Sequence, residues 1–377
     1  MTRELFIGLM SGTSLDGVDV ALVAFTEQKT QMLHSHFLAY PAALRAQILA
    51  LQHPTENELE NTALIGNALA KIYAEAVNQL LVDAQLSSNQ IVAIGCHGQT
   101  IRHRPGFEDG IGFTLQIGNA ALLSELTGIT VISDFRSRDI AAGGQGAPLV
   151  PAFHQAVFAD KQINRAIINI GGIANITYLG NSENFSNKSN GVYGFDSGPG
   201  NMLLDAWIKQ HKNLDYDANG DWASTGQVIP SLLSDMLAEP YFALLPPKST
   251  GRDLFNQAWL QEKLLATTTL RPQDVAYTLV ALTAHSIYNA LTQHCGEFNE
   301  VYVCGGGAHN RLLIELLQTL LGETKCDSTE SLGVGADWVE AIAFAWLAKQ
   351  CINKKTANLA EVTGAKGPRI LGAIYQH

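Results

Sequence analysis

Apolar and polar positions along this chain form short runs that end in glycine-rich turns. Leu5–Ser11 and Asp19–Thr26 are apolar runs separated by the polar turn Gly12–Gly17, and a similar run follows at 32–40. Such runs predict strands. Within 56–83, apolar residues recur instead at helical spacing, which predicts a long amphipathic helix. These residues are Leu59, Leu64, Ala68, Ile72, Ala76 and Leu80.

The pattern continues with short strands and then repeats. Strands are expected at 91–96, 112–117 and 130–133, followed by a polar loop at 134–147 and a helix from Pro148 to about 158. A second strand pair, 166–170 and 174–179, surrounds another glycine turn, and 181–191 resembles an exposed loop. Later helices are expected near 202–211, 228–238, 256–266, 273–294 and 337–349, with a strand at 301–304 and another helix from Arg311.

The repeated strand pair predicts two α/β domains. We place one at 1–160 together with about 353–377, because the tail is expected to pack on the first half. The other comprises 161–352, with a boundary near 160–164.

Composition restricts the class of protein. The 377 residues are 46% apolar and 16% charged, with a net charge of −11, which fits well-packed domains and disfavours nucleic-acid binding. Five scattered cysteines contain no Cys-x-x-Cys, so we expect no disulfide framework and a cytoplasmic location. The sequence offers neither a signal-peptide core nor an apolar run of about 18 residues, so no membrane span is expected.

Three glycine-rich elements suggest nucleotide binding: GLMSGTSLDGVD at 8–19, NIGGIAN at 169–175 and CGGGAHN at 304–310. Glycine lets backbone N–H groups approach phosphate closely. Three such elements at strand–turn junctions favour an ATP-dependent phosphotransferase. The alternatives are a simple hairpin turn for the first element and tight helix–strand packing for the third. The P-loop pattern is absent, and no G-x-G-x-x-G follows the first strand.

Two carboxylates are candidates for catalysis. Asp196, in GFDSGPGN, is expected at a strand end beside a helix start, where it can accept a proton or cap the helix. Glu340, in GADWVEAIAFAWLA, shares a helical face with apolar residues. It either faces a cleft or complements the helix dipole in the first turn.

The segment HGQT and the loop 134–147 supply candidates for substrate binding. Arg136 and Arg138 either bind an anionic substrate or form a surface ion-pair cluster with Asp139. His97 either orients a substrate hydroxyl or is structural. The histidines and cysteines show no zinc-type spacing, so a metal site built from protein ligands is not expected.

A close resemblance to the anhydro-N-acetylmuramic acid kinases is carried by eight blocks, in the family's order over about residues 5–373. They are GLMSGTSLDGVDVAL, HGQT, DFRSRDIAAGGQGAPLVPAFH, NIGGIANIT, GFDSGPGN, STGRDLF, CGGGAHN and GADWVEAIAFAWLA. The resemblance implies an actin/hexokinase/Hsp70-like (ribonuclease H-like) α/β fold with a nucleotide cleft between two domains. It implies that water opens the ring of 1,6-anhydro-N-acetylmuramic acid while ATP phosphorylates O6. The product would be N-acetylmuramic acid 6-phosphate, an intermediate of peptidoglycan recycling.

The resemblance also assigns roles to residues. Asp196 would be the general base, with Glu340 in support, and His97, Arg136 and Arg138 are the candidates for the substrate side. ATP would bind at Gly12, Thr13, Ser14, Leu15, Asp16, Gly17, Val18, Asp19, Gly171, Gly172, Gly305, Gly306, Gly307 and Asn310. Mg²⁺ would accompany ATP, and the protein would be a homodimer.

Two other functions stay open at this point. One is an ordinary amino-sugar or hexose kinase, in which Asp196 deprotonates a sugar hydroxyl and no water is consumed. The other is a non-catalytic nucleotide switch of the Hsp70 or actin kind, for which slow hydrolysis unaffected by sugar would be the sign.

Overall fold

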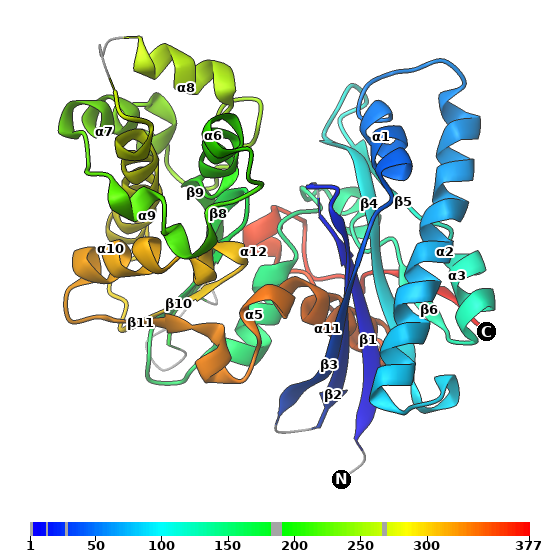
Figure 1. Cartoon of the computed structure of the whole chain (residues 1–377). Helices are drawn as coiled ribbons and strands as arrows, with labels where there is room; N and C mark the ends of the chain where they lie inside the picture. Colours follow the sequence, from blue (N-terminus) through cyan, green and yellow to red (C-terminus); the bar gives the residue numbers. More distant parts are fainter. Residues whose placement is uncertain (1–2, 13, 27–28, 182–190, 266–269) are drawn as a thin grey trace. The chain divides into compact units, whose positions relative to one another are not determined.

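The computed structural model describes residues 3–12, 14–26, 29–181, 191–265 and 270–377. The chain divides into two compact units (Figure 1). Unit 1 comprises Met1–Val157 and Trp338–His377, and unit 2 comprises Phe158–Asp337. Each unit contains one mixed β-sheet with helices, so the predicted two-domain α/β class is confirmed.

The sheet of unit 1 has the order β12-β6-β4-β1-β2-β3, with β5 paired to β4. β1–β2–β3 form an antiparallel meander, whereas β4 runs parallel to β1 and β6 runs parallel to β4. The strands are β1 (Glu4–Ser11), β2 (Gly17–Phe25), β3 (Thr30–Ala39), β4 (Ala93–Pro105), β5 (Gly112–Ile117), β6 (Val131–Ser133) and β12 (Ala373–Tyr375).

The sheet of unit 2 repeats this arrangement with the order β11-β10-β7-β8-β9. β7–β8–β9 are antiparallel, and β10 and β11 continue the sheet in parallel. The strands are β7 (Arg165–Ile170), β8 (Ile173–Leu179), β9 (Val192–Pro199), β10 (Glu300–Cys304) and β11 (Lys325–Ser328). The shared order and directions confirm the duplication expected from the two glycine hairpins, and they are those of the ribonuclease H-like fold.

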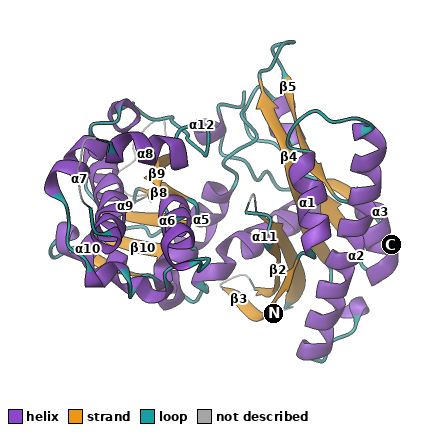
Figure 2. Cartoon of the chain, turned by 45° about the horizontal axis from the view of Figure 1, so that its top comes forward, coloured by secondary structure: helices purple, strands orange, loops and turns teal. Residues whose placement is uncertain are grey.

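Helices cover both faces of the unit 1 sheet. Ile7 and Leu9 of β1 belong to the core cluster that contains the apolar face of α2 (Glu58–Ala84). The alternate position, Gly8, faces α11 (Val339–Ile352) on the other side of the sheet (Figure 2). The other helices of this unit are α1 (Ala42–Ala50), α3 (Ala120–Thr127), α4 (Ser137–Ala141), α5 (Val150–Phe158) and α12 (Ala360–Thr363).

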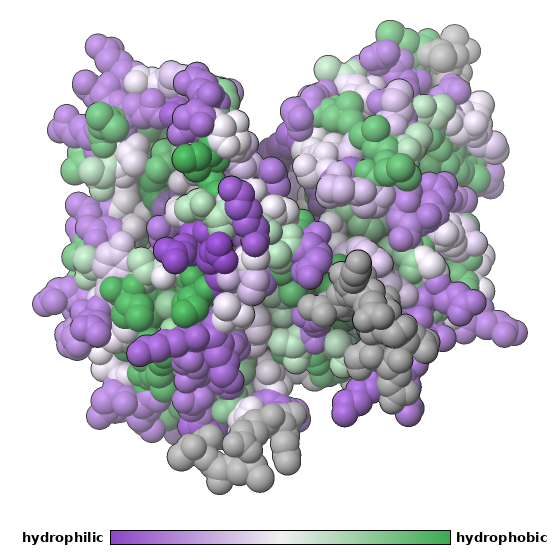
Figure 3. All heavy atoms as spheres, turned by 180° about the vertical axis from the view of Figure 1, so that it is seen from behind, coloured by the Kyte–Doolittle hydropathy of each residue, from purple (hydrophilic) through white to green (hydrophobic). Residues whose placement is uncertain are grey.

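The helices of unit 2 share one large core with the sheet. α9 (Pro272–His294) is buried along most of its length, which explains why its sequence is apolar almost all round. The others are α6 (Met202–Lys212), α7 (Pro230–Leu237), α8 (Gln257–Leu264) and α10 (Arg311–Leu321). Figure 3 shows hydrophobic and hydrophilic residues interspersed over one face of the molecule.

Several details differ from the sequence predictions. Residues 338–352 belong to unit 1, so the expected boundary at 352 is wrong and lies at Asp337. β4 extends to Pro105, which places His97 inside a strand rather than at its end, and the loop 134–147 contains α4. The predictions omitted α1, α3, α12, β11 and β12, and they gave no bounds for the strand expected near Asp196, which is β9. Residues 182–190 of the expected loop lie outside the described residues.

No helix among the described residues is long and apolar enough to cross a membrane.

Candidate active site

Asp196 lies on β9 and is held by the segment that precedes α8. The backbone N–H of Asp196 donates to the carbonyl of Lys248 at 3.1 Å, and the Tyr241 hydroxyl donates to the backbone carbonyl of Asp196 at 2.8 Å. The N–H of Thr250 donates to the carboxylate oxygen Oδ2 at 3.0 Å. The N-cap position of the helix that follows is Asn201, so the alternative role of Asp196 as a helix cap is wrong.

Partial burial changes the acidity of two carboxyls in unit 2. It raises the pKa of Asp196 to about 6, although the Thr250 N–H opposes the shift. Burial also raises the pKa of Asp205 to about 7, against the charge of Arg252. Such shifted carboxyls concentrate at functional sites. Asp205 is not distinguished by the sequence, where its only signal is a carboxylate in the first turn of α6.

The hairpin between β7 and β8 lies against the start of α6. The carbonyls of Gly171 and Gly172 accept hydrogen bonds from the N–H groups of Gly200, Asn201 and Met202. A side chain at Gly200 would overlap the carbonyl oxygen of Gly171, so only glycine allows this approach. The N–H of the exposed Gly172 has no hydrogen-bond partner among the described residues and is available to an anion.

The third glycine element forms a short 3₁₀ turn, Gly306–His309, after β10. Gly305 adopts a φ of 76°, and its N–H donates to the carbonyl of Ala336 at 2.9 Å. Gly306 is exposed, whereas a side chain at Gly307 would overlap Ile170. Asn310 caps α10 by accepting the N–H of Leu313 at 3.1 Å.

In unit 1, the turn between β1 and β2 presents backbone donors. The N–H groups of Ser14 and Asp16 have no hydrogen-bond partner within the described part of the chain. The Asp16 carboxylate instead accepts from the Ser14 hydroxyl at 2.6 Å and from the N–H of Gly17 at 3.1 Å. From β4, Gln99 donates to the carbonyl of Gly12 at 3.0 Å and anchors the turn.

The side chains of this turn have different environments. Leu15 and Val18 are core residues, so only their backbones can face a ligand. Asp19 is partly buried on β2. Thr13 lies outside the described residues. In this turn the backbone N–H groups of Ser14 and Asp16 are therefore open to a ligand, whereas the Leu15 and Val18 side chains are not.

The buried His97 is paired with the partly buried Arg136. The guanidinium of Arg136 donates to Nε2 of His97 from Nε at 3.1 Å and from Nη2 at 3.0 Å. Because guanidinium is only a donor, Nε2 must be the acceptor and the ring proton must be on Nδ1. Burial and the adjacent Arg136 charge lower the pKa of His97 to about 3, which keeps the ring neutral.

Glu340 lies in the first turn of α11, where its partly buried carboxyl interacts electrostatically with the charge of Arg136. Burial raises the pKa of Glu340, and the Arg136 charge opposes this shift. Side chains at Gly8 or Gly95 would overlap carbonyl oxygens of α11. The two glycines therefore let this helix lie directly on β1 and β4, which brings Glu340 into the same unit as His97.

Asp139 is fully buried, so the alternative of a surface ion-pair cluster is wrong. Its Oδ1 accepts from Asn358 at 2.7 Å and from Thr363 at 2.8 Å, and its Oδ2 accepts the N–H of Gly146 at 2.8 Å. The Gly146 carbonyl accepts from Arg136 at 2.9 Å. Asp139 thus ties the loop that carries Arg136 to the C-terminal segment, whereas the Arg138 side chain is exposed.

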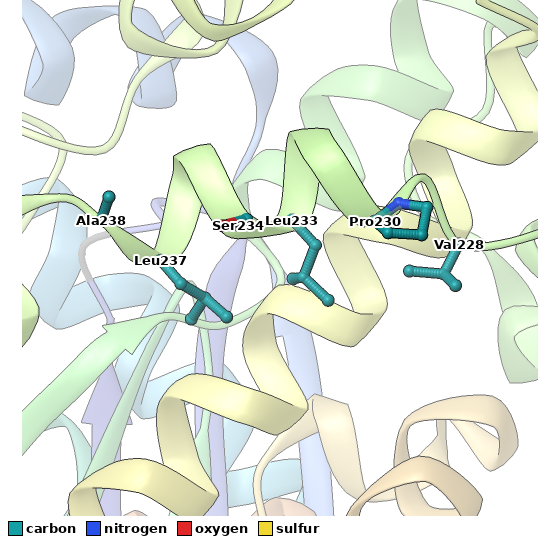
Figure 4. A pocket seen from close by; sticks show the side chains of 6 residues that line it. All are labelled: Val228, Pro230, Leu233, Ser234, Leu237 and Ala238. Carbon is teal, nitrogen blue, oxygen red and sulfur yellow. The ribbon is translucent and has the colours of Figure 1, made fainter.

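These candidates form two groups, one in each unit. Asp196, the Gly171–Gly172 hairpin and the Gly305–Gly307 turn belong to unit 2, while His97, Arg136 and Glu340 belong to unit 1 with the β1–β2 turn. A separate cavity of about 520 Å³ lies along α7, between Val228 and Ala238 (Figure 4). Its lining contains no ionisable side chain, so it is not a candidate for the chemistry.

A family model described as Anhydro-N-acetylmuramic acid kinase matches residues 4–377. The chain belongs to the anhydro-N-acetylmuramic acid kinase family. It is 51% identical over 375 residues to the anhydro-N-acetylmuramic acid kinase of Nitrosospira multiformis, with all of both chains covered. It is 52% identical over 375 residues to that of Thiobacillus denitrificans, covering 99% of this chain and 97% of the relative.

Solved structures resemble the chain more distantly. An activator of the 2-hydroxyisocaproyl-CoA dehydratase from Clostridium difficile, with bound ADPNP, shares 14% identity at a TM-score of 0.46, covering 93% of this chain and 97% of that one. A ROK family glucokinase from Streptomyces griseus, in complex with glucose and AMPPNP, shares 13% identity at a TM-score of 0.41, covering 92% of this chain and 99% of that one.

Membership of the anhydro-N-acetylmuramic acid kinase family fixes the activity of this chain. It is an ATP-using kinase of anhydro-N-acetylmuramic acid and belongs to peptidoglycan recycling. The predicted kinase function is confirmed, and the alternative of a non-catalytic switch is wrong.

Asp139 provides a test of the unit 1 cluster. The substitution Asp139→Asn would place an amide NH₂ opposite groups that all donate hydrogen bonds, so we expect a loss of about 3 kcal/mol in the free energy of unfolding. The KM for the anhydro-sugar should also rise, because the loop of Arg136 loses its anchor. Urea denaturation and steady-state kinetics would measure both effects.

Asp109→Asn is the matched control, because Asp109 accepts two backbone N–H groups in the same unit but is exposed. We expect it to cost less than about 1 kcal/mol. Equal losses in the two variants would contradict an anchoring role for Asp139.

Proposed function

We propose that Asp196 is the general base that couples ring opening to phosphoryl transfer. It would take a proton from the water that attacks C1 of the anhydro-sugar. The C1–O6 bond would then break, and O6 would accept the γ-phosphoryl group of ATP with ADP leaving. The proposal is carried by one observation: a partly buried carboxylate with a pKa of about 6 and one oxygen fixed by the Thr250 N–H.

Nucleotide binding is proposed for the glycine elements. The N–H groups of the Gly12–Asp19 turn would bind the phosphates, with Gly171 and Gly172 as a second phosphate element. Gly305–Gly307 would contact the adenosine, where the exposed Gly306 leaves the backbone accessible. Mg²⁺ would be held mainly by phosphate oxygens and water and would neutralise charge on the transferring group.

Substrate binding is proposed for the unit 1 cluster. Arg136 has five N–H donors, of which three are bound to His97 and Gly146, so two can still bind the lactyl carboxylate. His97, neutral and fixed in one tautomer, would orient Arg136 and a sugar hydroxyl. Arg138 would supply a second charge, and Glu340 would support the water or a sugar hydroxyl.

The decisive experiment is the reaction of 1,6-anhydro-N-acetylmuramic acid with ATP and Mg²⁺ in ¹⁸O-labelled water, followed by mass analysis of the early product. We expect one phosphoryl group and one labelled oxygen per product molecule. A product that gains only the phosphoryl group would overturn coupled ring opening and identify an ordinary sugar kinase.

The acidity of Asp196 predicts a pH dependence. A general base must be ionised, so kcat should rise with pH through about 6 and level off above that value. Steady-state kinetics between about pH 5 and 8 with saturating substrates would measure it. A kcat that is flat or falls through this range would contradict the role of Asp196.

If Arg136 and Arg138 bind the sugar, replacing them should change the KM for the anhydro-sugar but not the KM for ATP. Replacing either Arg136 or Arg138 with methionine removes a charge-assisted hydrogen bond worth about 1.5–3 kcal/mol. The KM for the anhydro-sugar should therefore rise at least about tenfold, while the KM for ATP should change little.

The control is Arg104→Met, since Arg104 is an exposed arginine of unit 1 that covers the ring of Phe107. It should leave both KM values unchanged. If Arg138→Met behaved like this control, Arg138 would have no role in substrate binding, and the same test applies to Arg136.

We further propose that the protein acts in the cytoplasm as a homodimer. The five cysteines are all free thiols, which supports a reducing compartment. The dimer is implied by the family resemblance, and light scattering of the purified protein would test it.

A further inference from the structure

Unit 2 contains another cavity, of about 320 Å³, which is more polar than the one along α7 and which no role described above uses. Its lining residues belong to β9, α9, the end of α7 and the segment that follows α7. Its lining includes Ser197, Lys248, Ser286, Asn289 and Gln293. The cavity therefore combines one cation with several groups that form hydrogen bonds.

Lys248 contributes the positive charge of this cavity. Its side chain is only 9% exposed, and its ammonium donates to the carbonyl of Phe242 at 3.2 Å. The ammonium also lies 5.0 Å from the centre of the Tyr241 ring. Among the described residues, no carboxylate lies within ion-pair distance of it. Since an ammonium has three donors, at least one remains for a ligand.

The other polar groups define what a ligand must offer. The hydroxyls of Ser197 and Ser286 already donate to backbone carbonyls at 3.1 and 3.0 Å. The amides of Asn289 and Gln293, one turn apart on α9, have no side-chain hydrogen bonds to other described residues and can donate. The lining thus offers hydrogen-bond donors together with one positive charge, and it contains no carboxylate.

We infer that this cavity binds a small oxyanion, a carboxylate or phosphate group, that pairs with the Lys248 ammonium and accepts from the amides of Asn289 and Gln293. A buried cation is stable when an anion neutralises it and when its remaining donors are bound. The volume of about 320 Å³ has room for a small molecule that carries such a group.

Occupancy of this site would act on Asp196. The Lys248 carbonyl accepts the Asp196 N–H, and the ring of Tyr241 lies under the Lys248 ammonium while its hydroxyl donates to the Asp196 carbonyl. An anion that attracts the Lys248 ammonium would displace Lys248 and Tyr241. The hydrogen bonds that these two residues form with the Asp196 backbone would then change. This consequence rests on the proposed role of Asp196, whereas binding of the anion does not.

The test is titration of the full-length protein with acetate and, separately, with inorganic phosphate at constant ionic strength, followed by thermal unfolding and calorimetry. We expect saturable stabilisation by at least one anion and at least tenfold weaker binding to Lys248→Met. The anion that binds identifies the group, carboxylate or phosphate.

Lys325→Met is the matched control, because Lys325 also lies 5.0 Å from a tyrosine ring, that of Tyr302, but is paired with Asp327 and is outside the cavity. It should bind the anion like the unaltered protein. The double variant Asn289→Ala/Gln293→Ala keeps Lys248 and should weaken binding severalfold, which tests the site even if Lys248→Met does not fold. Absence of binding, or binding unchanged in the cavity variants, would overturn the site.

Kinetics at saturating ATP and sugar distinguish an anion bound in this cavity from an anion that competes with a substrate. An anion at a substrate site raises a KM, whereas an anion in the cavity should change kcat at least twofold in the unaltered protein. If the anion binds through Lys248 but kcat does not change, the coupling to Asp196 is overturned and the binding site stands. Whether Asp196 is the base is tested separately by Asp196→Asn: normal turnover of that variant would exclude this role and leave the anion site untouched.

Discussion

Asp196→Asn is expected to lower kcat by about 10²- to 10⁴-fold, the contribution of a general base, while the KM for ATP stays near its normal value. The amide keeps the size of the carboxyl and can still accept the Thr250 N–H through its oxygen, so the loop should keep its position. Only the ability to take a proton is lost. Steady-state kinetics and nucleotide binding by calorimetry would measure the two effects.

The stability of the same variant provides an independent check. The folded state raises the pKa of Asp196 from 3.8 to about 6, so it binds the proton more tightly than the unfolded chain. The contribution of this group to stability is therefore present at low pH and lost as pH rises through about 6. Asp196→Asn should remove this part of the pH dependence and leave the protein at least as stable at pH 7.

Asp274→Asn is the control, because Asp274 is another carboxylate of unit 2 that accepts one backbone N–H, that of Gln227, and forms an ion pair with Arg271 at the surface. The kcat of Asp274→Asn should equal that of the unaltered protein. If Asp196→Asn also kept normal turnover, Asp196 would not be the base, whatever its effect on stability.

Gly95→Ala is expected to lower the free energy of unfolding by at least about 3 kcal/mol, the upper range for overpacking a tight core. Its new methyl group would overlap the carbonyl oxygen of Phe344 on α11. Neither β4 nor α11 can shift easily to relieve this overlap, because the backbones of both are tightly packed inside the core. Phe344 also contacts the ring of His97, with 4.8 Å between ring centres, so displacement of the helix should reduce kinase activity as well.

Gly66→Ala is the matched control, since Gly66 lies in α2 and the nearest atom to an added methyl group there is 3.7 Å away. Alanine favours helix over glycine by about 1 kcal/mol, so this variant should be neutral or more stable. Urea denaturation of both variants, followed by circular dichroism, would measure the difference. If Gly95→Ala were as stable as Gly66→Ala, close packing of α11 on β4 would not limit stability.

Local sequence was sufficient for the elements whose chemistry is contiguous. The strand–glycine–strand hairpins at Gly12–Gly17 and Gly171–Gly172 could be predicted because strand periodicity and turn residues lie within about 25 residues of each other. Asp196 could be selected because its glycine-rich surroundings mark a strand end. The bonds that fix this carboxylate could not, because Tyr241 and Thr250 are about 50 residues away and no periodic pattern connects them.

The sequence by itself determined the family, the two α/β units and most of the strands and helices, because these depend on local periodicity and on contiguous blocks of residues. Only the tertiary structure decided that α11 packs with unit 1, that Arg136 fixes the tautomer of His97, and that the buried Asp139 joins two distant segments. Those outcomes depend on desolvation and on contacts between residues up to 224 positions apart. Such contacts exist only after the chain has folded.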